Sequence, residues 1–350
     1  MNKYNAVKLS IDLIFPSVIK KSQITQDNSF LISYGEYPPQ IRCFDLHSLS
    51  LKFQRAIDHE VKDFCILSRN WEKFVLLKSN KCLEFHCKKG YYYQIKIPKT
   101  SNFLFFDKYD NILYIFSTGN EIFKFDINQG KFIKSITSSF VHPITSAAEF
   151  FPGRLIGTGN SKSMVEIWDL RINKISINKI NNQMYIRKKI LNGVSTLEFC
   201  KENINKIYSG FFSNEILVQD IRMAKPLILK KFKKKGTVLS LQKIERRNLV
   251  LCANEKTIKI WNEKNGKTIM TVRPKKQINH IYRENATGVI FISMMTSNVG
   301  CMYISLLGNI PSWCYITNKN SRKIIKNTFQ STKFFKQNFR KNHNLSIYQY

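Results

Sequence analysis

The side chains best suited to bind a metal lie close together at Cys82, His86 and Cys87. Thiolates and imidazoles are zinc ligands, but a structural zinc site needs four of them, usually as two close pairs. The sequence offers no second pair at a suitable distance, so we expect neither a metal nor another cofactor. The eight cysteines are scattered through apolar runs without a paired framework, which predicts reduced core residues in a reducing compartment.

Phosphate binding is the second chemistry that the residues suggest, because 56 Lys and Arg outnumber 24 Asp and Glu and set a formal net charge of +32. Such a field attracts the backbone of nucleic acid without reading its sequence. The charges cluster in two runs that we expect in exposed positions, and in a C-terminal tail, residues 317–350, that has no acidic residue. The predicted contacts with RNA or a partner are Arg187, Lys188, Lys189, Lys230, Lys231, Lys233, Lys234, Lys235, Arg322, Lys323, Arg340 and Lys341.

The positive charge also has an explanation in composition. Chains encoded in AT-rich genomes accumulate Lys, Asn, Ile and Phe, which are all abundant here. Clustering favours a binding surface, whereas uniform scatter favours composition. In the tail, Phe and Tyr interleave with the charges, a mixture that suits stacking on unpaired bases and equally suits a disordered arm that folds onto a protein. The sequence leaves both pairs of alternatives open.

A repeat predicts the elements that carry these residues. Apolar runs end in a two-residue stop, and the second members of successive stops are 41, 40, 43, 51, 42 and 42 residues apart. A period in the low forties, with Trp-Asp at the cleanest copy, is typical of the four-stranded blades of a propeller. We therefore predict an all-β fold, a seven-bladed WD40-type β-propeller over residues 1–316, followed by the short basic tail. The stops are Phe44-Asp45, Phe85-His86, Phe125-Asp126, Trp168-Asp169, Gln219-Asp220, Trp261-Asn262 and Tyr303-Ile304.

Each stop is expected to act structurally rather than catalytically. Its Asp can accept hydrogen bonds from the amides of the following turn and so hold the geometry of the blade. Residues 165–168 and 257–261, which lead into two stops, alternate polar and apolar side chains as strands do. Residues 157–160 and 209–214 are rich in Gly, Ser and Asn and are predicted to be the preceding turns. The 51-residue step predicts an extended loop around Arg187.

The N-terminal segment is expected to close the ring. Val7, Leu9, Ile11 and Leu13 alternate with polar residues, which describes a half-buried strand that could pair with the last blade and leave no open edge. Asp12 and Pro16 interrupt the same segment, so we expect neither a secretory signal nor a membrane span.

The sequence shows none of the familiar catalytic motifs. It lacks a glycine-rich phosphate loop followed by Lys and Ser or Thr, a nucleophile elbow and a His-Glu metal helix pattern. An enzyme site in the central channel would need a ring of polar groups at the start of each inner strand, and no such ring is apparent in the alternation. We therefore expect a protein that is not an enzyme and has no small-molecule substrate.

Several short segments resemble one family in chain order. Residues 37–45, Tyr-Pro-Pro-Gln-Ile-Arg-Cys-Phe-Asp, resemble the first-blade signature of the nucleolar protein ten family, WD-repeat proteins of ribosome assembly. Residues 84–86, Glu-Phe-His, with Gly-Tyr-Tyr-Tyr at 90–93, resemble its second blade, where His replaces Asp in the stop. The resemblance is collinear over about residues 30–316. Further matches are 220–222, 225–227, 259–262, 300–304 and 311–314.

The resemblance implies a non-enzymatic scaffold of early small-subunit assembly. Members of that family are nucleolar components of the 90S pre-ribosome, or small-subunit processome, and support 18S rRNA maturation. The implied partners are processome proteins, pre-rRNA and the U3 snoRNA particle, with no membrane. The propeller would present its rims to these factors while the basic runs neutralise RNA phosphates.

A rival function comes from two copies of the stop. Arg171 and Arg222 each follow the Asp by two residues, as in propellers that serve as substrate receptors of cullin-based ubiquitin ligases. The structural alternative is that each Arg pairs with acidic groups between blades.

Overall fold

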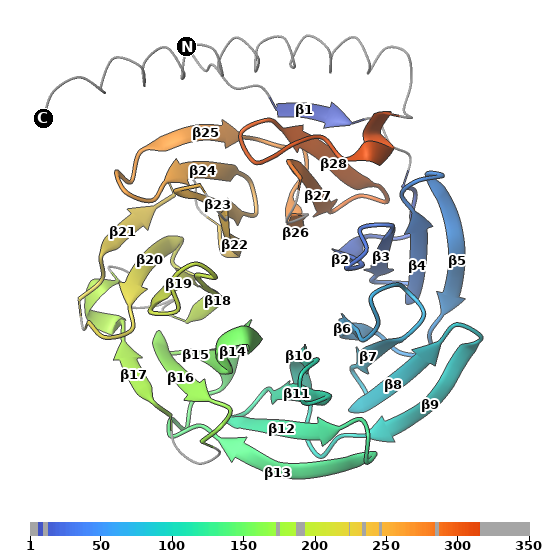
Figure 1. Ribbon diagram of the computed structural model, residues 1–350, viewed down its shortest axis with the longest axis horizontal. Helices are drawn as coiled ribbons and strands as arrows, with labels where there is room; N and C mark the ends of the chain where they lie inside the picture. Colours follow the sequence, from blue (N-terminus) through green and yellow to red (C-terminus); the bar gives the residue numbers. More distant parts are fainter. Residues whose placement is uncertain are drawn as a thin grey trace, which may run out of the picture.

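The computed structural model is a ring of seven four-stranded antiparallel sheets around a central channel (Figure 1). It describes residues 6–9, 13–172, 176–186, 193–223, 225–232, 236–244, 247–283 and 287–315. Within these ranges, no helix is long and apolar enough to cross a membrane. The predicted seven-bladed β-propeller is confirmed.

Each blade runs from an inner strand at the channel to an outer strand at the rim. Blade 1 holds β2 (Ile19–Ile24), β3 (Phe30–Gly35), β4 (Gln40–Asp45) and β5 (Ser50–Ala56). Blade 2 holds β6 (Val61–Ile66), β7 (Phe74–Lys78), β8 (Cys82–Cys87) and β9 (Gly90–Lys96). Blade 3 holds β10 (Ser101–Asp107), β11 (Ile112–Ser117), β12 (Glu121–Asp126) and β13 (Lys131–Thr137). Blade 4 holds β14 (Ile144–Phe150), β15 (Leu155–Asn160), β16 (Met164–Asp169) and β17 (Asn178–Asn181).

The second half of the ring follows the same plan. Blade 5 holds β18 (Val194–Phe199), β19 (Lys206–Phe211), β20 (Glu215–Asp220) and β21 (Ile228–Lys231). Blade 6 holds β22 (Val238–Ile244), β23 (Leu249–Asn254), β24 (Ile258–Asn262) and β25 (Thr268–Val272). Blade 7 holds β26 (Ile278–Arg283), β27 (Val289–Met294), β28 (Val299–Ile304) and, from the other end of the chain, β1 (Ala6–Leu9). Short 3-10 turns lie at Phe151–Gly153, Gln183–Tyr185 and Ser312–Tyr315.

The burial of a strand follows its place in the blade. Every residue of β15 and β23 is buried, because neighbouring blades cover both faces of these second strands. In the outer strand β9 no residue is buried. The core therefore lies between the blades rather than at one centre, and the aromatic residues of the stops fill it. Trp168 packs against Tyr114 and Phe116 of the preceding blade.

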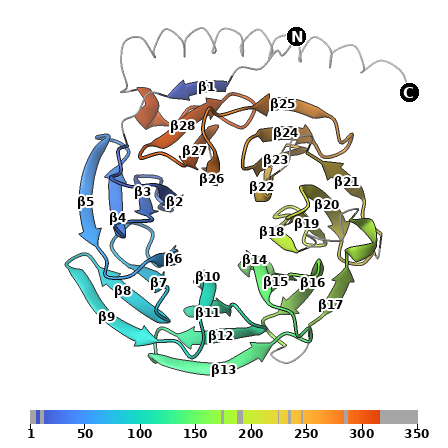
Figure 2. The same cartoon turned by 180° about the vertical axis from the view of Figure 1, so that it is seen from behind.

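The ring closes where the two ends of the propeller meet. β1 pairs antiparallel with β28, with Val7 opposite Tyr303 and Leu9 opposite Cys301, so an N-terminal strand completes blade 7. The chain leaving β28 folds back on the same blade, where the buried Trp313 lies 6.0 Å from Phe291, ring centre to ring centre. Figure 2 shows this closure from behind the ring. Both the first and the last segments thus seal blade 7.

One local prediction is wrong. Residues 157–160 and 209–211 belong to strands β15 and β19 and not to turns. Their glycines serve close packing: a Cβ on Gly159 would lie 2.7 Å from the Cβ of Val194 in the next blade, and a Cβ on Gly210 would lie 2.7 Å from Val238. Glycine is needed here because a neighbouring inner strand occupies the space of a side chain.

Candidate functional site

The acidic residues of the stops hold the turns that follow the third strands. In each case the side-chain oxygen accepts a hydrogen bond from the backbone N–H two residues later, which is the contact that a structural role requires. The acceptors are Asp45, Asp126, Asp169, Asp220 and Asn262, at 2.8, 2.8, 2.9, 3.0 and 2.9 Å. The preceding aromatic residues Phe44, Phe125, Trp168 and Trp261 are buried between blades.

Replacing Asp126 with alanine is expected to lower the free energy of unfolding by about 1–2 kcal/mol, because two turn amides lose their acceptor. These are the N–H groups of Asn128 and Gln129, at 2.8 and 3.2 Å from Oδ1. Urea denaturation measures the change. Asp126→Asn is the matched control and should stay within about 0.5 kcal/mol of wild type, since Asn262 performs this task in blade 6. Equal losses in both variants would show that the turn does not depend on this acceptor.

The two Arg residues that follow a stop pair within their own turns. Arg171 Nε lies 3.0 Å from Asp169 Oδ1, and Arg222 Nη2 lies 3.1 Å from Asp220 Oδ2. These hydrogen bonds lower the pKa of both carboxyls. The expectation that each Arg pairs with acidic groups between blades is therefore wrong, because each Arg reaches the Asp of its own turn and forms an ion pair there.

His86 is part of a network inside blades 1 and 2. One ring nitrogen, Nε2, lies 2.8 Å from Glu84 Oε1, and Arg55 donates to the other, Nδ1, at 3.1 Å. The ring stacks on Phe74 at 4.9 Å. Burial, followed by the charges of Arg55 and Lys78, lowers the pKa of His86 to about 4. Both nitrogens are thus used within the protein, and across the described chain no three His, Cys, Asp or Glu side chains gather as a metal would require.

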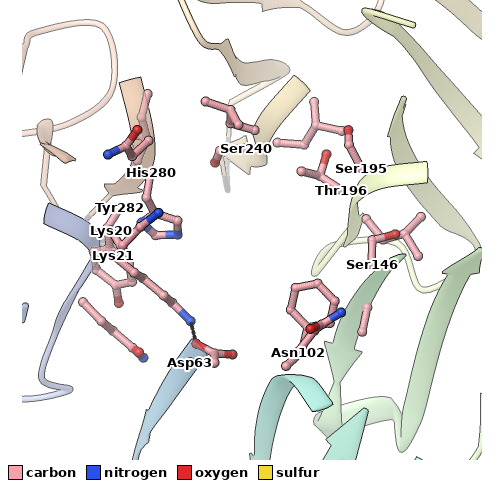
Figure 3. Close-up of a pocket in the computed structure, with 18 of the residues that line it drawn as sticks. Lys20, Lys21, Asp63, Asn102, Ser146, Ser195, Thr196, Ser240, His280 and Tyr282 are labelled. Atoms are coloured by element: carbon pink, nitrogen blue, oxygen red, sulfur yellow. Dashed lines mark hydrogen bonds and ion pairs between the residues drawn. The ribbon is translucent and has the colours of Figure 1, made fainter. Parts of the chain in front are cut away.

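The central channel is a concave site, a cavity of about 680 Å³ lined by all seven inner strands (Figure 3). Each inner strand contains a β-bulge near its first residue, so that one extra residue stands at the same level of every blade. Six of these seven residues are polar, and together they form a ring. They are Lys20, Lys62, Asn102, Thr145, Ser195, Leu239 and Asn279.

Three residues of this ring connect blades to each other. Thr145 Oγ1 donates to the carbonyl of Val194 at 2.6 Å, Ser195 Oγ to that of Val238 at 2.7 Å, and Asn279 Nδ2 to that of Ile19 at 2.9 Å. Each acceptor is the first residue of the next inner strand. The polar ring is therefore explained at these positions by assembly of the propeller and not by chemistry on a substrate.

Asp63 connects three blades at the wall of the channel. Its Oδ1 lies 2.5 Å from Lys21 Nζ of blade 1, a pair that Figure 3 shows beside the cavity. The same carboxylate accepts the N–H groups of Phe64 at 2.8 Å and of Leu104, in blade 3, at 3.0 Å. A buried carboxylate that accepts from three donors, one in each of blades 1, 2 and 3, strongly stabilises the contact between these blades.

Two carboxyl groups on neighbouring inner strands, those of Glu149 and Glu198, have raised pKa values. Burial raises the pKa of Glu149 to about 7, although Lys21 opposes the shift. Burial, with the charge of Glu149 as a smaller cause, raises the pKa of Glu198 to about 8. Glu149 is exposed to the channel and Glu198 is half-buried, but the protein that surrounds both carboxyl groups there still disfavours their charged forms.

This acidity predicts a pH dependence of stability. Between pH 4.5, the ordinary pKa of Glu, and about 8, folded Glu198 keeps a proton that the unfolded chain has lost, so stability falls as the pH rises through this window. Glu198→Gln should flatten this decline and be the more stable protein at pH 8–9. Thermal unfolding between pH 5 and pH 9 measures it, with the exposed Glu36→Gln as control. A Glu198→Gln curve parallel to that of wild type would contradict the expectation.

The structure places only part of the predicted basic contacts. Lys230 and Lys231 end the outer strand β21, as expected, but Lys230 is half-buried rather than exposed. Its ammonium lies 4.5 Å from the Trp261 ring centre and donates to the Gly266 carbonyl at 2.7 Å, and burial lowers its pKa to about 8. Lys231 Nζ lies 3.3 Å from Glu215. Their contact with RNA stays a prediction.

The remaining predicted contacts lie outside the described residues. These are the run at 187–189, the run at 233–235 and the whole tail at 317–350. The polar ring of the channel was missed for a different reason: the bulge inserts one residue into each inner strand and interrupts the alternation that marks a strand. A search for one polar residue immediately after an apolar first residue of each inner strand would have found five of the seven positions, all except those in β10 and β22.

Comparison with known proteins agrees with the residue-level evidence. The family model described as "Nucleolar protein 10-like, N-terminal domain" matches residues 2–320. "Nucleolar protein 10" of Danio rerio is 28% identical over 328 residues, which cover 92% of this chain and 45% of that protein. "Ribosome biogenesis protein ENP2" of Saccharomyces cerevisiae is 28% identical over 324 residues, 89% of this chain and 44% of that protein. The chain thus spans about half the length of the curated relatives it matches.

Among solved structures, the ring is similar to one part of a much larger protein. Raptor of Chaetomium thermophilum superposes with a TM-score of 0.71 at 10% identity, over 85% of this chain and 29% of that one. Such a likeness concerns the fold alone. The family match is different, because it extends over the whole propeller, including the stop in blade 2 that carries His86. By this match and by its closed ring of seven blades, the chain belongs to the nucleolar protein 10-like family.

Proposed function

We propose that this chain is a non-enzymatic scaffold of ribosome biogenesis in the nucleolus. Within that role we place it in early assembly of the small subunit, in the 90S pre-ribosome or small-subunit processome, where it supports 18S rRNA maturation. Its partners would be processome proteins and pre-rRNA, with the U3 snoRNA particle nearby.

One observation carries the proposal. The match to proteins named for the nucleolus and for ribosome biogenesis covers 89–92% of the chain and coincides with the closed ring. The residues of the ring support a scaffold rather than an enzyme, since the stops hold turns and the polar channel residues join blades. A rigid ring suits the display of loops and rims to several partners at once.

Sedimentation of the tagged protein from cell extract tests this function. RNA and proteins are identified in each fraction of the gradient. The expected result is migration with large particles that contain pre-18S rRNA and small-subunit assembly factors. A light peak without RNA would overturn the proposal and would leave composition as the explanation of the charge.

Affinity purification in the same extract addresses the cullin alternative. Recovery of adaptor and cullin subunits in place of assembly factors would support the substrate-receptor function. The geometry gives that function little support, because Arg171 and Arg222 are held by their own turns.

A further inference from the structure

The outer strands of blades 1–3 form an unusual stretch of the rim. β5, β9 and β13 have seven residues each, whereas β17, β21 and β25 have four or five. The three long strands follow one another along the circumference (Figure 1). They carry basic and aromatic or aliphatic side chains and no Asp or Glu. A surface of this composition complements a polyanion. Its exposed basic residues are Lys52, Lys96, Lys131 and Lys134.

The edges of these strands are poorly suited to pair with another strand. In β9 the residue Tyr92 has no partner, because Phe85 pairs with Tyr93 and His86 with Tyr91. In β5 Lys52 is the extra residue in the same way, and β13 has a corresponding shift. Bulges of this kind protect an edge against addition of a strand. A partner of this rim is therefore expected to bind through side chains. An extended peptide, which would bind by adding a strand to the sheet, suits the rim less well than a partner that contacts side chains.

Two tyrosines at the bulge of β9 are exposed, and ring contacts with neighbouring side chains support them. Tyr91 and Tyr92 are 57% and 68% exposed. Tyr93, next to them, stacks on Phe85 with ring centres 4.4 Å apart and planes at 10°, and Tyr92 meets Tyr93 edge-on at 5.0 Å. Tyr92 thus rests on the half-buried Tyr93, which rests on the buried Phe85, and Tyr91 meets the buried His86 edge-on at 6.4 Å. An aromatic side chain held in this way loses little conformational entropy when it binds.

The turn that begins β9 is held as well. Arg55 of β5 donates from Nη2 to the carbonyls of Cys87 and Lys88, at 2.9 and 3.1 Å. Lys88 and the adjacent Lys89 are exposed, and Lys88 makes only a long contact of 3.7 Å with Glu72. Exposed pairs of this kind cost little to open. The backbone that carries the two lysines is therefore held beside the two rings.

We propose that Lys88, Lys89, Tyr91, Tyr92 and Lys96, the blade-2 rim, bind single-stranded RNA. Bases stack on the two tyrosine rings, and the lysines neutralise the flanking phosphates. Paired RNA would not fit as well, because its bases are already stacked on each other. This inference rests on the proposed function for the identity of the polyanion, but it names a surface that lies outside the basic runs at 187–189 and 230–235 and outside the tail.

The test uses the purified full chain and a fluorescent oligouridine of about ten nucleotides, a length within the usual site size of such proteins. The double variant Tyr91→Leu, Tyr92→Leu keeps apolar side chains and removes the rings, and we expect its affinity to fall at least about tenfold. Tyr109→Leu is the matched control, since Tyr109 is 65% exposed in another turn. Thermal unfolding of each variant checks that the ring is intact.

Two further measurements separate stacking from charge. Lys88→Gln with Lys89→Gln should make the salt dependence of binding shallower, by a slope of about 0.7 for each phosphate that is no longer neutralised. Photo-crosslinking with 5-iodouridine RNA should mark Tyr91 or Tyr92. Equal affinity in the tyrosine variant and the Tyr109→Leu control would overturn the proposal. Unchanged RNA binding together with loss of a processome protein from the purified particle would assign the rim to a protein instead.

Sedimentation of wild type, compared with the oligouridine affinity of the tyrosine variant, distinguishes this proposal from the function on which it rests. If wild type migrates with pre-ribosomes and the oligouridine affinity of the variant is unchanged, the blade-2 rim is wrong and the assembly function stands. If wild type itself does not enter large particles, the assembly function fails, whatever the rim binds in the oligouridine assay.

Discussion

Replacing Trp168 with alanine is expected to lower the free energy of unfolding by about 3–5 kcal/mol. The side chain is 3% exposed and fills the space between blades 3 and 4, where it packs with Tyr114, Phe116 and Ile156. Truncation leaves a cavity that two blades, each held by its other neighbour, cannot close. Urea denaturation measures the loss as a lower midpoint with an unchanged slope.

The control for this prediction is Trp168→Phe. It keeps most of the buried area and loses the hydrogen bond from Nε1 to Thr158 Oγ1, which is 3.2 Å long. Phe125 occupies the equivalent position of blade 3. The Phe variant should therefore lose less than half of what the Ala variant loses. An Ala variant within about 1 kcal/mol of wild type would show that the space between blades collapses, contrary to this expectation.

Replacing Asp63 with alanine should cost about 3–4 kcal/mol, because one carboxylate is shared by three blades. Its loss leaves the ammonium of Lys21, 26% exposed, without its partner, and it removes the acceptor of the N–H groups of Phe64 and Leu104. An unpaired charge and unsatisfied amides beside the channel are costly. The same denaturation experiment measures the change.

A second substitution separates the charge from the amide contacts. In Lys21→Met with Asp63→Ala the unpaired charge is absent, and the double variant should be at least about 1 kcal/mol more stable than Asp63→Ala alone. Asp63→Asn keeps an acceptor for the amides and should lie between wild type and the alanine variant. If the double variant is the least stable of the three, the ion pair does not contribute as proposed.

The seven-bladed architecture could be predicted from the sequence because the residues that repeat are the ones that are buried between blades. Aromatic residues such as Trp168 and Trp261 recur where a third strand ends, and the sequence of the closing strand alternates apolar and polar residues. Glycines misled the assignment locally. Gly159 and Gly210 lie in segments that have the composition of turns. Glycine is needed at both positions because the next blade packs against them, and the local sequence does not indicate this contact.

The candidate sites were less predictable for the same reason. Whether Lys230 faces solvent depends on Trp261, 31 residues later, whose ring the ammonium covers. The purpose of Thr145 likewise depends on Val194 in the next blade. His86 could be assigned to a structural role only by resemblance, because its partner Arg55 comes from another blade. Contacts between blades decide these roles, and they have no fixed spacing in the chain.

The closure of the ring has a consequence for biosynthesis. β1 is translated before its partner β28, which comes about 290 residues later, at Cys301 opposite Leu9. At about 5–20 residues per second, the strand waits about 15–60 s for its partner. During that time β1 is unpaired and the ring is incomplete. Because an unpaired strand edge invites aggregation, a chaperone that shields β1 on the ribosome would protect the chain during this wait.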